Sequence, residues 1–425
     1  MKLVVSYKEL VLFFCLPFMF FSDILYGLFV YYGIGLPLTP GVLFRGGLFF
    51  ICLTYVILYF KYLNVGIAIW LLVLFLFSLP GLFSGLVYGD NPKYDFFIFT
   101  KLFYFPLVAA AFFIFFKLVN VFSDDVLKHI EYSGYFLGVS LVLSQTFGLS
   151  RDTYGDYAYG NVGVFYAQND LSLALGLSLL IAAYRLLFLK FSVLRCFLLL
   201  LSFIACINIG TNSALFIPVV VFCVMFSAFI MGGSSGFTKL TPSKVFLFFG
   251  FSVFAIALFF QVLEIFLSHD YQAKKIEALL EGEFSRAQLV SAAWAYLSQR
   301  GLLLNIFGEG FDSFHRGVSY YFGGTSVRRF VESDPFDIMG GHGIAFLLAL
   351  YFYPIYHMAI NIWRSFLNMN AGTHVLIASS IFLFVMYSVF VGHTLISPIP
   401  STLMAGILAL SHMKELNVKK LANEV

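Results

Sequence analysis

Apolar residues fill most of the chain in stretches of about twenty residues, the length that one helical membrane crossing requires, and short polar turns separate the stretches. Within each stretch the apolar residues are continuous and do not alternate, which favours helices over a transmembrane β-barrel. A helix also satisfies its own backbone hydrogen bonds in hydrocarbon. The pattern therefore predicts an all-α, polytopic transmembrane helix bundle that forms one domain over residues 1–425.

Twelve spans are predicted from these apolar stretches. They cover residues 10–30, 42–60, 65–83, 97–116, 126–147, 171–188, 194–209, 214–231, 245–267, 343–363, 375–391 and 399–410. An even number of spans places both termini on the same side of the membrane. The connection at Thr211 and Asn212 is very short, so the seventh and eighth spans could instead form a re-entrant hairpin.

The distribution of Lys and Arg predicts the orientation of this bundle. If the N terminus is inside, fourteen basic residues lie in the inner segments, and only Arg45, Lys93, Lys101 and Arg151 lie in the short outer ones. Inner loops of membrane proteins carry the excess of basic residues. Both termini are therefore predicted to be cytoplasmic. The long polar segment over residues 268–341 is then an outward-facing loop between the ninth and tenth spans.

Composition supports lipid as the surrounding solvent and excludes several classes of function. The chain is 61% hydrophobic and 11% charged, whereas soluble domains are roughly 25% charged. A net charge of +3 gives no reason to expect a nucleic-acid partner. The five cysteines all lie in apolar runs without a neighbouring ligand at metal spacing. We therefore expect neither a disulfide framework nor a metal site, and no cofactor.

The long loop is predicted to hold an amphipathic helix over residues 276–297. Its apolar residues fall within about 80° of one direction at 100° per residue. Arg286 lies at the edge of this stripe, where its guanidinium can reach the headgroup layer. An irregular region is expected at Gly308–Gly310 and over residues 316–324, and His342 is placed where the next helix begins.

Arginines and carboxylates gather in this loop beside the membrane. Arg328 and Arg329 precede an acidic run made of Glu332, Asp334 and Asp337. Arginine binds phosphate through paired, charge-assisted hydrogen bonds, and a carboxylate can deprotonate an attacking hydroxyl. Phosphate held next to lipid, together with a hydroxyl nucleophile, indicates glycosyl transfer from a polyprenyl diphosphate. Aromatic side chains such as those of Tyr320 and Tyr321 suit sugars.

Structural roles for the same residues remain open. Arg328 and Arg329 could anchor headgroups, and Arg286 could be a solvated charge on its helix. The acidic run could cap the following helix. The tyrosines could belong to an interfacial belt. Arg151, on another outer loop, could form a local ion pair instead of binding a diphosphate.

Short motifs resemble those of a known family. They are GVFYAQND at residues 163–170, GTNSA at 210–214, RAQLVSAAW at 286–294 followed by FGEGF at 307–311, ESD at 332–334 leading into GHGI at 341–344, and GHT at 392–394 with SP at 397–398. The chain resembles the bacterial O-antigen polymerase and ligase superfamily, and the polymerase branch is the closer match. Ligases tend to have Arg where this chain has Ala214, and His where it has Glu332.

The resemblance implies a periplasmic, inverting, metal-independent glycosyltransferase. It implies that Arg286 binds the donor diphosphate. The donor would be a growing glycan on undecaprenyl diphosphate, the acceptor one repeat unit on the same carrier, and a chain-length regulator a possible partner. Glu332 or Asp334 would take the proton, with Asp337 and His342 also open as the base. The predicted substrate-binding residues are Arg328, Arg329, Arg151, Arg316, His342, His393, Tyr320 and Tyr321.

Two other functions fit the same sequence. An O-antigen ligase would transfer a finished glycan to the lipid A core and make a single transfer. A lipid-linked oligosaccharide flippase or another transporter would also need many spans. Transporters usually carry charges along a path near the middle of the membrane and show two related halves. Here the ionisable residues cluster in one loop, which favours an enzyme.

Overall fold

The fold is known from a computed structural model. It describes residues 6–36, 38–89, 91–154, 159–165, 168–189, 191–234, 285–324, 327–367 and 371–412, together with residues 250, 253, 260 and 264. Nearly all of the predicted span over residues 245–267 lies outside the described residues. Residues 268–284, which begin the predicted loop and its amphipathic helix, also lie outside them.

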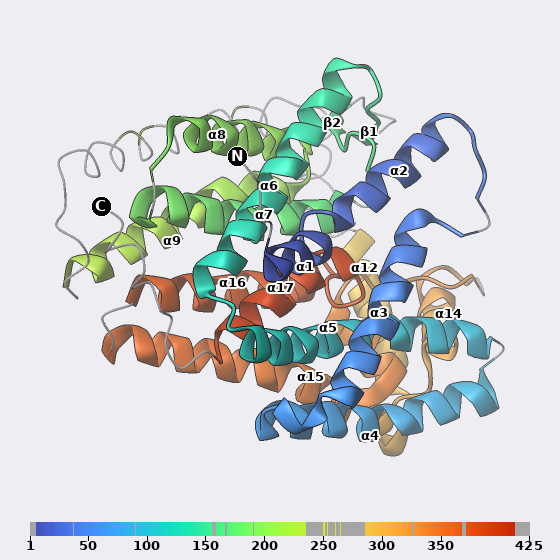
Figure 1. The fold of residues 1–425 in the computed structure, drawn as a ribbon. Helices are drawn as coiled ribbons and strands as arrows, with labels where there is room; N and C mark the ends of the chain where they lie inside the picture. The colour runs from blue at the N-terminus through green and yellow to red at the C-terminus, as the bar shows by residue number, and fades with distance from the viewer. Residues whose placement is uncertain are drawn as a thin grey trace.

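Helices make up almost all of the described fold (Figure 1). The first half contains α1 (Tyr7–Cys15), α2 (Met19–Tyr31), α3 (Pro40–Leu58), the 3-10 helix η1 (Phe60–Tyr62), α4 (Val65–Tyr88), α5 (Pro92–Val119), α6 (Ser123–Thr146), and strands β1 (Asp152–Tyr154) and β2 (Tyr159–Asn161). The second half contains α7 (Gln168–Tyr184), the π-helix η3 (Arg185–Leu189), α8 (Val193–Asn208), α9 (Asn212–Ser234), α12 (Ser285–Ser298), α13 (Leu302–Phe307), α14 (Phe311–Gly323), α15 (Asp334–Leu367), α16 (Ala371–Phe390) and α17 (Pro398–Leu410).

Seven helical segments of the described chain are long and apolar enough to cross a membrane. They are Tyr7–Tyr31, Pro40–Leu58, Val65–Val87, Pro92–Val119, Gln168–Leu189, Asp334–Leu367 and Ala371–Phe390. Shorter apolar helices occur at Val193–Asn208, Asn212–Ala228 and Pro398–Leu410. The polytopic helical fold is thus confirmed, while the total of twelve spans and the side on which the loop lies stay predictions.

Two predicted boundaries are wrong. Residues 316–324 were expected to be irregular, but most of them belong to α14, whose residues Phe311, Phe314 and Val318 recur at helical spacing and are buried. The tenth span was expected to begin at Gly343. Instead α15 begins at Asp334 and is kinked at Gly343, which has φ 82° and ψ 171°. The sequence pattern placed the start at the kink because the apolar run begins there.

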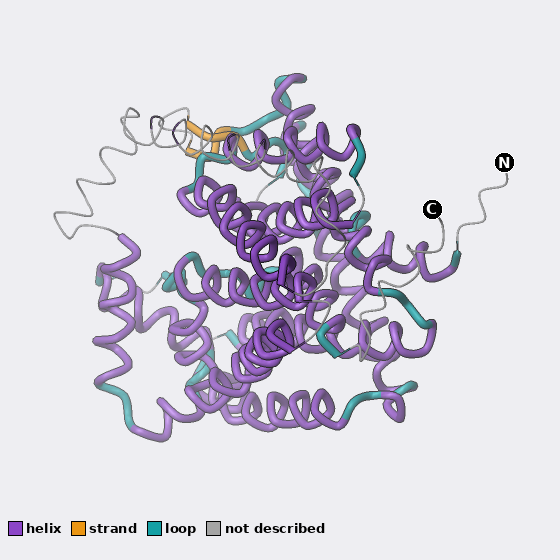
Figure 2. Tube along the Cα trace, turned by 90° about the vertical axis from the view of Figure 1, so that its left-hand side faces the viewer, coloured by secondary structure: helices purple, strands orange, loops and turns teal. Residues whose placement is uncertain are grey.

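Helix α7 lies at the centre of the bundle. It packs against α6, α9 and α17, while α15 packs against α16, and α5 against α17 (Figure 1). Every α7 residue from Leu171 to Tyr184 is buried. Small residues permit the close approach: a Cβ on Gly134 of α6 would lie 2.7 Å from the Ser178 side chain of α7. Figure 2 shows the β1–β2 hairpin at one edge of this helical core.

Two glycine-rich segments far apart in the sequence interlock through their backbones. The Gly310 amide donates to the Gly341 carbonyl at 3.0 Å. A Cβ on Gly308 would lie 2.2 Å from that same carbonyl oxygen, and a Cβ on Gly343 would lie 2.2 Å from the Ile306 oxygen. Gly308 and Gly343 both have φ 82°, which side-chain-bearing residues rarely adopt. The turn after α13 is therefore locked against the kink of α15.

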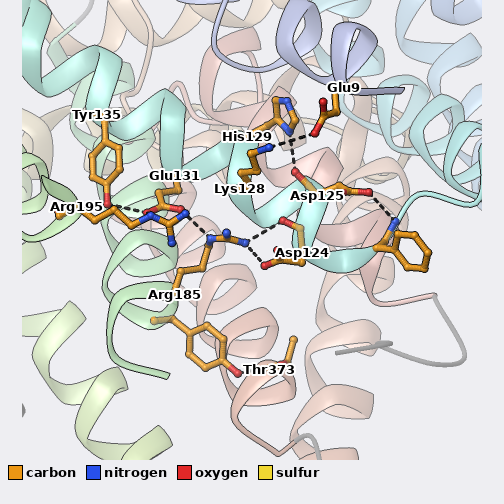
Figure 3. Close-up of polar contacts among 12 residues, drawn as sticks. Glu9, Asp124, Asp125, Lys128, His129, Glu131, Tyr135, Arg185, Arg195 and Thr373 are labelled. Carbon is orange, nitrogen blue, oxygen red and sulfur yellow. Dashed lines mark hydrogen bonds and ion pairs between the residues drawn. The ribbon is translucent and has the colours of Figure 1, made fainter. Parts of the chain in front are cut away.

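A buried ionic network joins α6, η3 and α8 on the predicted cytoplasmic side (Figure 3). The Glu131 carboxylate, fully buried, accepts from Arg185 Nε and the Tyr135 hydroxyl, each at 2.7 Å, and lies 3.6 Å from Arg195. Asp124 forms an ion pair with Arg185. Two arginines face two carboxylates, so the charges balance. Buried charges with such partners hold helices together and do not indicate a reaction site.

We expect Gly343→Ala to destabilise the protein by about 1–3 kcal/mol, because the methyl group would collide with the Ile306 carbonyl at a left-handed position. Unfolding in detergent, followed by circular dichroism, measures this change. Gly47→Ala is the control, since Gly47 lies in α3 with nothing within 4 Å of an added Cβ. Equal stability of the two variants would contradict the interlock.

The predicted orientation can be tested with an impermeant thiol reagent on intact cells. In a cysteine-free background, Tyr320→Cys should be labelled from outside, because this side chain is 68% exposed and lies on the predicted periplasmic side. Lys117→Cys, on the predicted cytoplasmic side, should be labelled only after lysis. The reverse result would overturn the orientation.

Candidate active site

Residues 285–324 and 327–333, here called the cap, form a small unit against the spanning helices. Helices α12 and α14 pack face to face through a core of their own that includes Leu289, Ala293, Leu297, Phe314 and Val318. These residues recur three or four apart in each helix, so one face of each is apolar. The packing fixes the direction in which the first turn of α12, with Arg286, points.

Arg286 and Glu332 form an ion pair at the edge of the cap. Arg286 Nη2 and Nε donate to Glu332 Oε2 at 2.8 and 3.2 Å, and Nη1 donates to the Phe390 carbonyl at 2.9 Å. The side chains remain 27% and 43% exposed, so a ligand could reach both. Glu332 has a left-handed backbone, with φ 61°, and Gly392 packs directly against it. The structure thus unites two residues that the sequence analysis selected separately.

A cavity of about 1050 Å³ lies between α3, α5, the start of α7 and the segment before α17. Its lining includes Phe49, Phe50, Phe75, Phe96, Phe97, Phe99 and Phe103, together with the ionisable residues Arg45, Lys93, Lys101, Asp170 and His393. Phe50 and Phe96 are 67% and 61% exposed on helices of membrane-spanning length, which means that the cavity opens sideways toward lipid. Its wall suits a long apolar chain, and its polar groups suit a charged headgroup.

Near neighbours of the ion pair line the cavity. Phe330 and His393 both line it, and their rings meet with centroids 4.9 Å apart. Glu332 follows Phe330 by two residues, and its backbone contacts Gly392, the neighbour of His393. The Arg286–Glu332 pair is therefore close to the cavity, but neither residue is part of its lining.

The other predicted carboxylates are already occupied by hydrogen bonds. Asp334 Oδ2 accepts from the Leu395 amide at 2.9 Å and from the Ser388 hydroxyl at 2.8 Å. Asp337 Oδ1 accepts from the Val331 amide at 3.0 Å and lies 2.9 Å from His315 Nε2. Both carboxylates are buried, so these contacts tie the start of α15 to its neighbours.

His342 lies in an aromatic cage next to the kink of α15. Its ring centroid is 5.9 Å from that of Phe99, 5.1 Å from that of Phe311 and 4.9 Å from that of Phe346. It is buried, and neither ring nitrogen has a hydrogen-bond partner among the described residues. The side chain packs as an aromatic ring, separated from the Arg286–Glu332 pair in its contacts.

Two predicted arginines share one buried carboxylate. Arg328 forms an ion pair with Asp312, and Arg316 Nη2 lies 3.4 Å from the same side chain. Asp312 is fully buried and also accepts from the Asn91 amide at 3.1 Å. The Arg328 guanidinium lies over the Tyr94 ring, 4.9 Å from its centroid. Asp312 thus holds both guanidinium groups at this part of the cap.

The remaining candidates make local contacts. The Arg329 guanidinium lies 4.5 Å from the Phe322 ring centroid, and Arg151 Nη2 donates to the Phe165 carbonyl at 2.7 Å. Tyr320 is mostly exposed, and the Tyr321 hydroxyl donates to the Gln299 amide oxygen. The roles of Arg151, Arg329, Tyr320 and Tyr321 in substrate binding stay predictions.

A buried hydrogen-bonded chain escaped the sequence analysis. The Tyr94 hydroxyl lies 2.9 Å from His315 Nδ1, and His315 Nε2 lies 2.9 Å from Asp337 Oδ1. Nearby, Asp95 accepts hydrogen bonds from the first amides of α14, at Phe311 and Asp312. These hydrogen bonds join α5, α14 and α15, so they fix the cap to the bundle. One signal in the sequence was Asp95, an acidic residue two positions before the predicted span over residues 97–116.

Within the cap, the Gly-x-Gly turn carries an ion pair of its own. Arg300 Nε lies 3.6 Å from Glu309 Oε2, and both side chains are largely buried. Burial raises the pKa of the Glu309 carboxyl, and the Arg300 charge and a hydrogen bond from Tyr296 oppose that shift. Burial likewise lowers the pKa of Arg300, opposed by Glu309. The pair holds the turn beside α12 and faces inward.

Comparison with known families decides the class of this protein. A family described as O-antigen ligase like membrane protein matches residues 5–264. The chain belongs to this family. It is therefore a multi-pass membrane protein of a glycosyltransferase-like family whose role concerns membrane glycans. None of the curated proteins matches the chain. The family match ends before the cap, so Arg286 and Glu332 lie beyond the matched region.

A double-mutant cycle can measure how much the hydrogen bonds among Tyr94, His315 and Asp337 stabilise the fold. His315→Ala should destabilise the protein by about 2–4 kcal/mol, because it leaves the buried Asp337 carboxylate and the Tyr94 hydroxyl without their shared partner. Combined with Tyr94→Phe, it should cost less than the sum of the two changes. Unfolding in mixed micelles measures both quantities. Tyr356→Phe, on an exposed ring of α15, is the matched control, and additive effects of the pair would contradict the coupling.

Proposed function

We propose that this protein is a glycosyltransferase that polymerises oligosaccharide repeat units linked to undecaprenyl diphosphate, on the periplasmic face of the bacterial inner membrane. The observation that carries the proposal is the cavity with a phenylalanine-rich wall, whose lining residues Phe330 and His393 are near neighbours of the Arg286–Glu332 pair. The polyprenyl chain of one lipid-linked substrate fits this wall, and the glycan of that substrate would extend toward the pair. Membership in the O-antigen ligase like family supports the same class of reaction.

The proposed reaction uses two lipid-linked glycans. A hydroxyl oxygen of the acceptor attacks the anomeric carbon of the donor, and a new glycosidic bond forms with inversion. The bond between that carbon and the donor diphosphate breaks, and the diphosphate leaves on its lipid. Glu332 accepts the hydroxyl proton. Arg286 stabilises the charge that develops on the departing diphosphate, a contribution that is typically on the order of 3 kcal/mol.

Accessibility favours Glu332 as the base among the four candidates. Its side chain is 43% exposed, and within the described part of the protein its carboxylate accepts hydrogen bonds from Arg286 alone. By contrast, Asp334 and Asp337 accept buried hydrogen bonds within the fold, and His342 is enclosed by aromatic rings. The guanidinium of Arg286 keeps the Glu332 carboxylate in one orientation. We therefore assign proton acceptance to Glu332 and structural positions to the other three.

Three further residues have places in this proposal. His393 lines the cavity, where its ring can contact the sugar that follows the diphosphate. Arg316 and Arg328 lie in the cap on Asp312. Their guanidinium groups would attract the phosphates of an approaching lipid-linked substrate.

A ligase is the second candidate, since membership in a family described as O-antigen ligase like does not distinguish the two functions. A ligase would use the same donor and the same base but would transfer the glycan once, to the lipid A core. The acceptor separates the two functions. A polymerase needs only lipid-linked repeat units and yields a ladder of products, whereas a ligase needs core oligosaccharide and yields none.

The decisive measurement is incubation of purified protein with one lipid-linked repeat unit, followed by electrophoresis of the glycans. We expect a ladder from the wild-type protein. Arg286→Ala should lower the rate about a hundredfold or more, and Glu332→Gln by a comparable factor, because each removes one participant in the transition state. Lys117→Ala, on an exposed side chain of the predicted inner side, should keep the wild-type rate.

Three results would count against this assignment. A product that appears only when core oligosaccharide is added would favour the ligase. Ladders of normal rate from Arg286→Ala and Glu332→Gln would remove the pair from the mechanism. A wild-type protein that moves the lipid-linked unit across vesicles without forming new glycosidic bonds would identify a transporter.

A further inference from the structure

Most of the basic residues that do not follow the positive-inside rule line the same cavity. Of the four basic residues predicted to lie in short outer segments, Arg45, Lys93 and Lys101 line it. Lys and Arg are usually rare in short outer segments. The presence of these residues there therefore calls for an explanation other than membrane orientation. Their place in one cavity suggests a common ligand.

Lys101 is the most informative of these cations. It lies nine residues after Pro92, the first residue of α5, which is about 14 Å along a helix that is long and apolar enough to span the membrane. Its ammonium lies 4.4 Å from the centroid of the Phe97 ring. Ionisable residues within spanning helices are rare and usually face a partner or a substrate path. Lys101 faces the cavity.

The charges along the cavity do not balance within the protein. Arg45 is neutralised by an ion pair with Asp23. In the described part of the chain, neither Lys93 nor Lys101 makes a salt bridge, and Asp170 is the one carboxylate that lines the cavity with them. Two lysines facing one aspartate leave a net positive charge beside an apolar wall. The buried network around Glu131 shows the opposite arrangement, with every charge paired.

We propose that Lys101 and Lys93 bind the diphosphate of a second polyprenyl carrier lipid inside the cavity, with the lipid chain along the phenylalanines of α3 and α5. The inference rests on the proposed function and deepens it, because polymerisation requires two carrier lipids at once. Arg286 stabilises the donor diphosphate at the cap, while Lys93 and Lys101 bind the acceptor diphosphate inside the cavity. The acceptor glycan then extends past His393 toward Glu332.

The chemistry of the wall and the cations supports one class of ligand. A free phosphate or pyrophosphate would use the lysines but leave the apolar wall uncovered. An ordinary phospholipid would cover the wall, but it has a single phosphate and short chains. A polyprenyl diphosphate has both a long apolar chain and two adjacent anionic groups. It therefore uses the whole cavity.

Binding of undecaprenyl diphosphate to the full-length protein in phosphatidylcholine nanodiscs, measured by native mass spectrometry, tests the proposal. We expect the wild-type protein to bind it at least tenfold more tightly than undecaprenol, which lacks the charge. Lys101→Gln should lower the affinity for the diphosphate about tenfold and leave that for undecaprenol unchanged. Lys101→Arg, which keeps the charge, should restore binding.

Lys61→Gln is the matched control, since Lys61 also lies over an aromatic ring, that of Tyr62, but outside the cavity. It should bind like the wild-type protein. Unchanged affinity in Lys101→Gln would overturn the proposal, as would equal competition by inorganic pyrophosphate or by phosphatidylglycerol. Unfolding in detergent checks that each variant is folded.

Failure of this inference can be told apart from failure of the proposed function. Binding that depends on Lys101, without any ladder of products, would keep the carrier-lipid site and reject polymerisation. A ladder whose rate and substrate KM are unchanged in Lys101→Gln would keep the polymerase and reject the site. If both hold, Lys101→Gln should raise KM about tenfold with little change in kcat, because Lys101 is remote from the bonds that change.

Discussion

The close backbone contact between the turn after α13 and the kink of α15 is the constraint on which the site depends. No side chain fits between Gly308 and Gly341, or between Gly343 and Ile306, so the two segments can meet only as bare backbone. That contact positions the cap on the bundle. The hydrogen-bonded chain through His315 then fixes its orientation. Together they position the cap, from which Arg286 reaches Glu332 and the Phe390 carbonyl.

Charges inside the apolar part of this protein are of two kinds. Around Glu131 each cation has a carboxylate partner, and the network holds three helices in place. Along the cavity the balance is incomplete among the described residues, where the half-buried Lys101 and the exposed Lys93 share the lining with one carboxylate, that of Asp170. Burial of a charge such as that of Lys101 is costly unless a partner compensates it. The first kind completes the fold, whereas the second kind is what the proposed ligand would complete.

The helical bundle and much of its element order could be predicted from the sequence, because apolar length and continuity report directly on membrane helices. The candidate residues Arg286 and Glu332 were also found, from charge type and motif. The contact between them could not be predicted, since residues 46 positions apart carry no pairing signal in one sequence. The same limit hid His315 and Tyr94, which lie 221 positions apart and look like ordinary aromatic and polar residues.

Other failures have a local cause. The start of α15 was misplaced because Asp334 and Asp337 look like loop residues, although they bind amides and hydroxyls inside the fold. Helix α14 was missed because its glycines and tyrosines resemble a turn-rich segment. In both cases, tertiary contacts overrode the local pattern. Lys101 entered the sequence analysis only in the count of charges, and the role proposed for it depends on the cavity that it lines.

The left-handed backbone at Glu332 and His393 limits which substitutions these two positions can accept during evolution. Their φ angles are 61° and 59°, a region that β-branched residues avoid and that glycine and asparagine enter with least strain. During divergence, each position would therefore sample only a narrow set of side chains without loss of the turn. New acceptor preferences in related proteins should accordingly arise from residues around these turns, while the turns themselves change little.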